Sequence, residues 1–328
     1  MHGSLGSDTG GSIRCPAAAT GVVGLAPSHG RVSRYGAMPM SLSLDVVGPL
    51  ARTVRDAALL LDAIAGPDPN DASAIDVAKA GFESALDGPA RPLRVGIACG
   101  YFDDDIHSDI RRSFEGAADE IGRAGFALTF VKMPAELLRK AADLHPLVMK
   151  AEAAANHMKS MRALEREYSS EVANRLHAGF FIPAADYIQA LKVRGSFLRD
   201  FVAAAFTNCD VLLTPTLALR VPTIAETTGK RGKDYLDMVA GLTRNTKVIN
   251  FLGLPAMTVP CGFDTRGLPI GIQLIARPFD EVSLLRVGHA YQRRTIWHDQ
   301  RPAVARGVAN VMAGTEQEIL VKNEKSKS

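Results

Sequence analysis

The sequence predicts an α/β protein whose mixed central sheet is flanked by helices. Short apolar runs at residues 93–98 and 126–131 enclose an amphipathic helical pattern at 105–124. This succession is typical of a βαβ unit, which pairs two parallel strands. Three further apolar runs, at 211–214, 256–259 and 270–275, add short strands to the sheet.

The expected helices are marked by their end signals. Thr53 followed by Asp56 is a capping-box-like start, and Gly66-Pro67 closes that helix. Another helix is expected over 281–294, and residues 135–206 form a helical insertion. Breaks in the pattern of this insertion are expected at Pro146, Gly179 and Pro183.

Composition indicates a cytoplasmic enzyme and disfavours several other classes. The 328 residues are 47% hydrophobic, enough to bury a large core, and we expect one domain over 1–300 and a tail over 301–328. The net charge of +3 and the lack of a basic block interleaved with aromatics give no support for a nucleic-acid partner. No apolar run reaches the roughly 18 residues of a membrane span. Four widely spaced cysteines favour reduced thiols in a cytosolic protein.

Neither a metal nor a cofactor is expected. Asp103-Asp104-Asp105 is interpreted as a solvated helix N-terminus, because carboxylates stabilise that end of a helix. The run Gly96 to Gly100 is not a dinucleotide fingerprint, and no Walker A loop is complete.

The most informative motif is the stretch from Gly6 to Pro16, which places a hydroxyl directly after two glycines at Gly10-Gly11-Ser12. Glycine takes backbone conformations closed to other residues, so the N–H groups of Thr9 to Ser12 can converge on one point as an anion-binding nest. A tetrahedral oxyanion formed by attack of Ser12 would lie in that nest. The helix expected from Ile13 would add a favourable partial charge.

These residues resemble the core of the amidase signature family. The resemblance continues from Gly21 to Gly66 and returns over 210–216 and 254–298, which together make about half of the chain. It implies that Ser12 is the nucleophile and that the amides of Thr9, Gly10, Gly11 and Ser12 form the oxyanion hole. It also implies the family's α/β fold without its N-terminal portion, and an insertion that roofs the cleft.

Four further residues fall on family positions near the site. Asp8 and Arg14 are expected to brace the loop, with an ion pair between them favoured over contact of Arg14 with a substrate carboxylate. Ser43 and Asp45 are expected either to line the cleft or to cap a turn.

The family activates its serine with a lysine acting through a second serine, and both lie upstream of the first residue here. The expected function is therefore a carboxamide hydrolase with an acyl-enzyme, impaired by the absence of that pair. A substitute Ser-His-Asp triad would use His29, His289 or His298, although no histidine lies beside the motif in the sequence. The alternatives are an esterase, a non-catalytic fragment or pseudoenzyme, and an A-type amidotransferase component. The expected partner is a small-molecule amide or ester, with a homodimer as one possible assembly.

Overall fold

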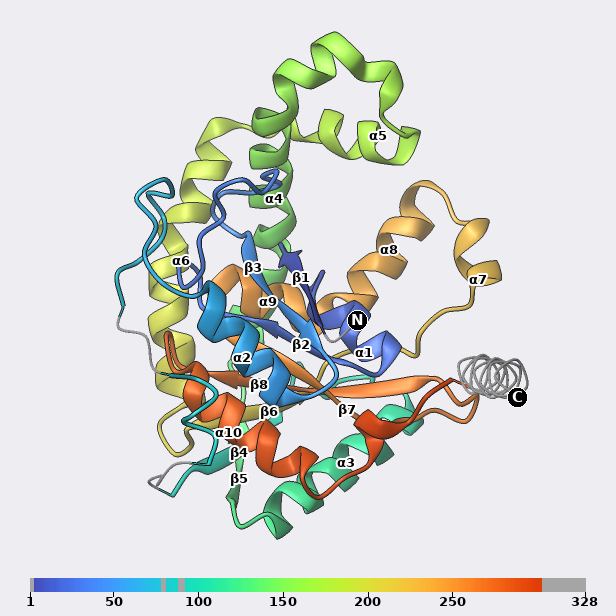
Figure 1. Ribbon diagram of the computed structural model, residues 1–328. Coiled ribbons are helices and arrows are strands. Elements are labelled where there is room, and N and C mark those ends of the chain that lie inside the picture. The colour runs from blue at the N-terminus through green and yellow to red at the C-terminus, as the bar shows by residue number, and fades with distance from the viewer. Residues whose placement is uncertain (1–2, 78–80, 88–91, 303–328) are drawn as a thin grey trace, which may run out of the picture.

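The computed structural model describes residues 3–77, 81–87 and 92–302. At its centre is an eight-stranded sheet with the strand order β1-β3-β2-β7-β8-β6-β4-β5 (Figure 1). Strand β4 runs parallel to β5 and β6, and the other neighbours are antiparallel, so the mixed sheet is confirmed. The strands are β1 (Gly3–Asp8), β2 (Val23–Ala26), β3 (Val46–Ala51), β4 (Arg94–Cys99), β5 (Ala127–Lys132), β6 (Val211–Pro215), β7 (Ala256–Phe263) and β8 (Pro269–Ala276).

Five of these strands, β4 to β8, occupy the five segments expected from the apolar runs. Strand β7 is longer than expected, because it continues through an irregular pairing between Pro260 and Gly262. Strands β1 to β3 were not expected: β1, with the sequence GSLGSD, has a single large apolar side chain, and β2 is only four residues long.

Helices cover both faces of the sheet. One face packs against α2 (Val54–Ile64), α3 (Ser108–Arg123) and α10 (Glu281–Gln292), which lie in front of the strands in Figure 1. The other face carries α1 (Arg14–Thr20), α4 (Ala135–Leu164), α6 (Ala184–Ala205) and α9 (Arg244–Leu252). Neighbouring residues on one strand serve different faces: Leu274 belongs to the first core and Ile275 to the second.

The expected helix ends are mostly confirmed, with one correction. The Thr53 hydroxyl accepts a hydrogen bond from the Asp56 N–H at 3.0 Å and caps α2, and α5 (Ser170–Gly179) ends at Gly179. Helix α6 begins after Pro183. The break at Pro146 is wrong, because α4 is continuous from Ala135 to Leu164. Packing against α5, α6 and α9 offsets the intrahelical hydrogen bond that a proline removes.

The acidic run at 103–105 lies in the loop before α3, which begins at Ser108. Within the ranges that the structure describes, no group of three potential ligands is placed to hold a metal ion.

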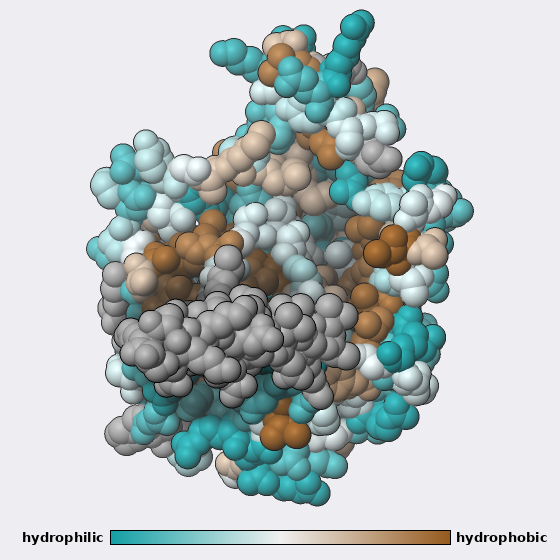
Figure 2. Space-filling view, turned by 45° about the vertical axis from the view of Figure 1, so that its right-hand side comes forward, coloured by the Kyte–Doolittle hydropathy of each residue, from teal (hydrophilic) through white to brown (hydrophobic). Residues whose placement is uncertain are grey.

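The remaining helices extend beyond the sheet. Helix α5 follows the 3-10 turn Glu165–Glu167, α7 (Ile224–Thr228) and α8 (Gly232–Leu242) precede α9, and a second 3-10 turn spans Trp297–Asp299. In the space-filling view the end formed by α4 and α5 projects from the body, and a hollow lies beneath it (Figure 2). None of the described helices is long and apolar enough to cross a bilayer. The expected tail falls almost entirely on residues 303–328, outside the described part of the chain.

Candidate active site

Ser12 lies in the turn between the end of β1 at Asp8 and the start of α1 at Arg14. Strand β1 is at the edge of the sheet and pairs with β3. The Ser12 side chain is exposed, and its hydroxyl makes no hydrogen bond with any residue that the structure describes. A hydroxyl in this position is open to a molecule from solvent.

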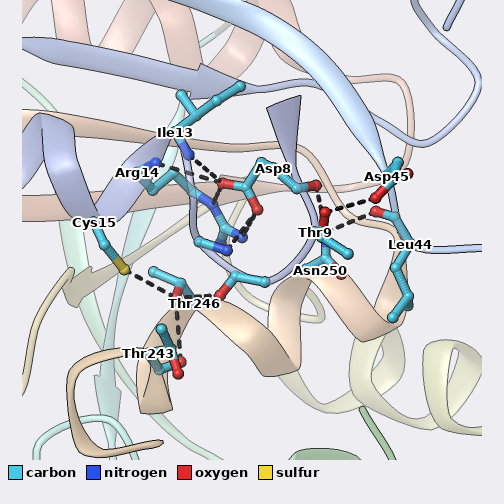
Figure 3. A network of polar contacts seen from close by, with 12 residues as sticks. Asp8, Thr9, Ile13, Arg14, Cys15, Leu44, Asp45, Thr243, Thr246 and Asn250 are labelled. Atoms are coloured by element: carbon cyan, nitrogen blue, oxygen red, sulfur yellow. Dashed lines mark hydrogen bonds and ion pairs between the residues drawn. The ribbon is translucent and has the colours of Figure 1, made fainter. Parts of the chain in front are cut away.

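A buried ion pair joins the two ends of this turn (Figure 3). Arg14 Nη2 and Nε each lie 3.0 Å from an oxygen of the Asp8 carboxylate, and the two side chains are 1% and 0% exposed. Burial alone raises the pKa of Asp8, but the Arg14 charge and the hydrogen bonds from Arg14, Ile13 and Gly11 bring it below its usual value. Arg14 Nη1 also donates to Gln273 Oε1 on β8 at 2.8 Å. The expected ion pair is therefore present and anchored to the sheet.

The same carboxylate organises the backbone of the loop. Its Oδ1 accepts a hydrogen bond from the Gly11 N–H at 2.6 Å, and its Oδ2 accepts one from the Ile13 N–H at 3.2 Å. Among the described residues, no acceptor meets the N–H groups of Thr9, Gly10 or Ser12. Gly11 is thus occupied by Asp8, whereas the other three N–H groups that the resemblance assigns to an oxyanion hole have no partner within the described chain.

Asp45 and Ser43 both bear on the loop, directly or through a neighbour. Asp45 Oδ1 accepts a hydrogen bond from the Thr9 hydroxyl at 2.6 Å, and its Oδ2 accepts from the Ser41 N–H at 2.8 Å. Ser43 donates its N–H, at 2.9 Å, and its hydroxyl to the carboxylate of Glu152 on α4. These bonds connect the segment around residue 45 to both the motif and the helical insertion.

Sequence reasoning missed the residues that contact the loop from behind. His145 on α4 and Thr246 and Asn250 on α9 each reach a main-chain carbonyl of residues 8–10. Cys15 Sγ lies 3.4 Å from the Thr246 hydroxyl. More than 130 positions separate His145 from the motif in sequence, so no local pattern signals this contact.

The three histidines considered for a triad lie elsewhere. His29 contacts the Leu42 carbonyl at 3.2 Å, His289 lies 3.6 Å from Asp87, and His298 lies 3.8 Å from Asp299. Within the described chain, none of them is hydrogen-bonded to Ser12.

Comparison with known proteins defines the family. A family model described as Amidase matches residues 1–285, so this chain belongs to the amidase family, whose solved members include amidase signature enzymes. The A-type component of glutamyl-tRNA(Gln) amidotransferase from Roseiflexus castenholzii is 39% identical to it over 327 aligned residues, covering 92% of this chain and 64% of that protein. The same component from Thiobacillus denitrificans is 36% identical, with coverage of 91% and 65%.

Two solved structures share the fold. The A-type component of the Thermotoga maritima glutamyl-tRNA(Gln) amidotransferase has a TM-score of 0.74 and 33% identity, covering 90% of this chain and 63% of that one. A bacterial aryl acylamidase of the amidase signature family has a TM-score of 0.75 and 27% identity, covering 92% and 65%. The chain spans less than two thirds of the length of each of these four relatives.

Proposed function

We propose that this chain carries the nucleophile and oxyanion site of a hydrolase that cleaves carboxamide C–N bonds. The Ser12 hydroxyl attacks the carbonyl carbon, the C–N bond breaks as the amine or ammonia leaves with a proton, and water hydrolyses the acyl-enzyme. One observation carries the proposal: an exposed serine hydroxyl lies beside main-chain N–H groups that have no partner within the described chain.

We assign the oxyanion to the N–H groups of Thr9, Gly10 and Ser12. The Gly11 N–H is excluded from this set because it donates to Asp8 at 2.6 Å. Donors of this kind stabilise the charge that develops on the carbonyl oxygen, and removal of one typically costs about 10²- to 10³-fold in turnover.

Asp8 and Arg14 support the loop in this proposal, and neither contacts the substrate. Both are enclosed, and their hydrogen bonds are to each other, to the loop and to Gln273. Asp45 supports the Thr9 side of the loop, and Ser43 holds the same segment to Glu152.

Activation of Ser12 limits the rate that we expect. No described histidine or lysine is hydrogen-bonded to the Ser12 hydroxyl, and loss of one member of such a catalytic unit costs about 10⁴ to 10⁶ in turnover. We therefore expect slow hydrolysis of amides by this chain, and faster hydrolysis of activated esters, whose leaving groups depart without a general acid.

A second candidate is an A-type amidotransferase component. It is favoured by the relatives at 36–40% identity, which are named as this component of glutamyl-tRNA(Gln) amidotransferase. Such a role would take ammonia from an amide donor and would require partner proteins.

Hydrolysis of a nitroanilide and release of ammonia from glutamine, each measured with Ser12→Ala beside the wild type, test the proposal. We expect both signals that exceed background to vanish in Ser12→Ala. Preference for glutamine would favour the amidotransferase role, and preference for the nitroanilide a general amidase. Turnover that survives Ser12→Ala would contradict the proposal, whereas silence of the wild type toward amides and esters alike would support a non-catalytic chain.

A further inference from the structure

Three consecutive carbonyl groups of the loop are held by side chains from the helices behind it. Asn250 Nδ2 donates to the Asp8 carbonyl at 3.0 Å, and the Thr246 hydroxyl donates to the Gly10 carbonyl at 2.8 Å. Between them, His145 Nε2 lies 2.7 Å from the Thr9 carbonyl oxygen. All three side chains are buried, and Figure 3 shows Thr246 and Asn250 on the α9 side of the loop.

The direction of a carbonyl decides the direction of the next N–H. In a planar trans peptide the C=O and the N–H point to opposite sides. A carbonyl of Thr9 fixed toward α4 therefore turns the N–H of Gly10 away from α4. The Gly10 N–H is one of the groups that find no partner within the described chain.

The contact also defines where the proton of His145 lies. A carbonyl oxygen only accepts, so Nε2 carries the proton and donates it. The same nitrogen is then unable to take a proton from Ser12, which separates His145 from the base of a triad. Burial lowers the pKa of His145 to about 4, so the ring is neutral at neutral pH.

The ring also packs directly on the glycine whose N–H it orients. A Cβ added to Gly10 would lie 2.8 Å from His145 Cε1 and 3.0 Å from its Nε2. The imidazole thus restricts the Thr9–Gly10 peptide both by its hydrogen bond and by contact. Since α4 belongs to the 135–206 insertion, that insertion reaches the loop itself.

We infer that His145 is a positioning residue, which orients the Gly10 N–H toward the oxyanion by donating to the Thr9 carbonyl. This inference rests on the proposed function, because it requires that an oxyanion forms at this loop. Asn250 and Thr246 hold the neighbouring carbonyls in the same sense.

The test compares two substitutions that both remove the ring. His145→Gln keeps an N–H donor on the side chain, and His145→Leu does not. The control is His157→Leu, which removes another buried histidine of the same helix, one that contacts the Tyr168 hydroxyl at 3.1 Å. The reaction measured is modification of Ser12 by a fluorophosphonate.

We expect His145→Leu to react on the order of 100-fold more slowly than the wild type. His145→Gln should recover most of the rate, and His157→Leu should match the wild type. Equal rates for the Leu and Gln variants at position 145 would overturn the inference.

A spectroscopic arm does not depend on reactivity, so it separates failure of this inference from failure of the proposed function. The chain contains three Thr–Gly pairs, at 9–10, 20–21 and 228–229. Threonine labelled with ¹³C at its carbonyl and glycine labelled with ¹⁵N therefore report on Gly10 beside two internal controls. We expect the Thr9 carbonyl shift to change in His145→Leu relative to His145→Gln while the other two pairs stay fixed, and identical Thr9 shifts would overturn the inference.

Discussion

The conformation of Gly11 gives the sharpest prediction of the loop's energetics. Gly11 has a φ of +133°, and a Cβ added there would lie 2.2 Å from the Thr246 hydroxyl oxygen and 2.7 Å from Cys15 Sγ. Such a backbone costs an L-residue about 1–3 kcal/mol. Overlap with packed neighbours adds about 1–3 kcal/mol. We therefore expect Gly11→Ala to lower the free energy of unfolding by about 2–6 kcal/mol, the sum of the two terms.

A second glycine separates the two terms. Gly36 has a φ of +82°, and a Cβ there would meet nothing within 4 Å. Gly36→Ala carries only the conformational cost, about 1–2 kcal/mol. Urea denaturation of both variants beside the wild type measures the difference. If Gly11→Ala proved as stable as Gly36→Ala, the close approach of Thr246 and Cys15 to the loop would be refuted.

Two further changes test the buried electrostatics behind the loop. Asp8→Asn removes the carboxylate that pairs with Arg14, so we expect a loss of about 3–5 kcal/mol in urea denaturation at neutral pH, and an unchanged midpoint would contradict the pairing. Burial lowers the pKa of His145 to about 4 from 6.5; the charge of Lys247 adds to this, and the Thr9 hydrogen bond and the charge of Asp8 oppose it. As the pH falls from 6.5 to 4 the unfolded chain takes up this proton first, so the group contributes a loss of about 3 kcal/mol that His145→Gln should lack. Parallel stability curves for wild type and variant over that pH range would contradict the buried, neutral ring.

The sequence allowed the parallel part of the sheet to be predicted because its signals are local. The apolar runs of β4 and β5 flank an amphipathic helix, and each pattern is complete within a few turns or residues. Strand β1 escaped prediction because its pairing partner β3 supplies its regularity: Gly3 to Asp8 pair in register with Ala51 to Val46. Pro146 within α4 shows the same limit, since a local breaker is offset by packing against α5, α6 and α9.

The candidate site divides in a similar way. Gly10, Gly11 and Ser12 are adjacent in the chain, so their chemistry was open to inspection of the sequence. His145 was not, because its contact with Thr9 spans 136 positions and depends on how α4 packs. The involvement of the Gly11 N–H with Asp8 likewise required the path of the turn.

The central claim is that Ser12 is the nucleophile, and mapping a covalent label tests it most directly. A fluorophosphonate reacts at a serine whose oxyanion is stabilised, so peptide mapping by mass spectrometry should place the adduct on Ser12 and find none in Ser12→Ala. The exposed position of this side chain predicts that Ser12→Ala changes stability by no more than about 0.5 kcal/mol, which keeps the comparison free of unfolding. An adduct on another serine, with Ser12 unmodified in a sample that hydrolyses an amide, would contradict the account.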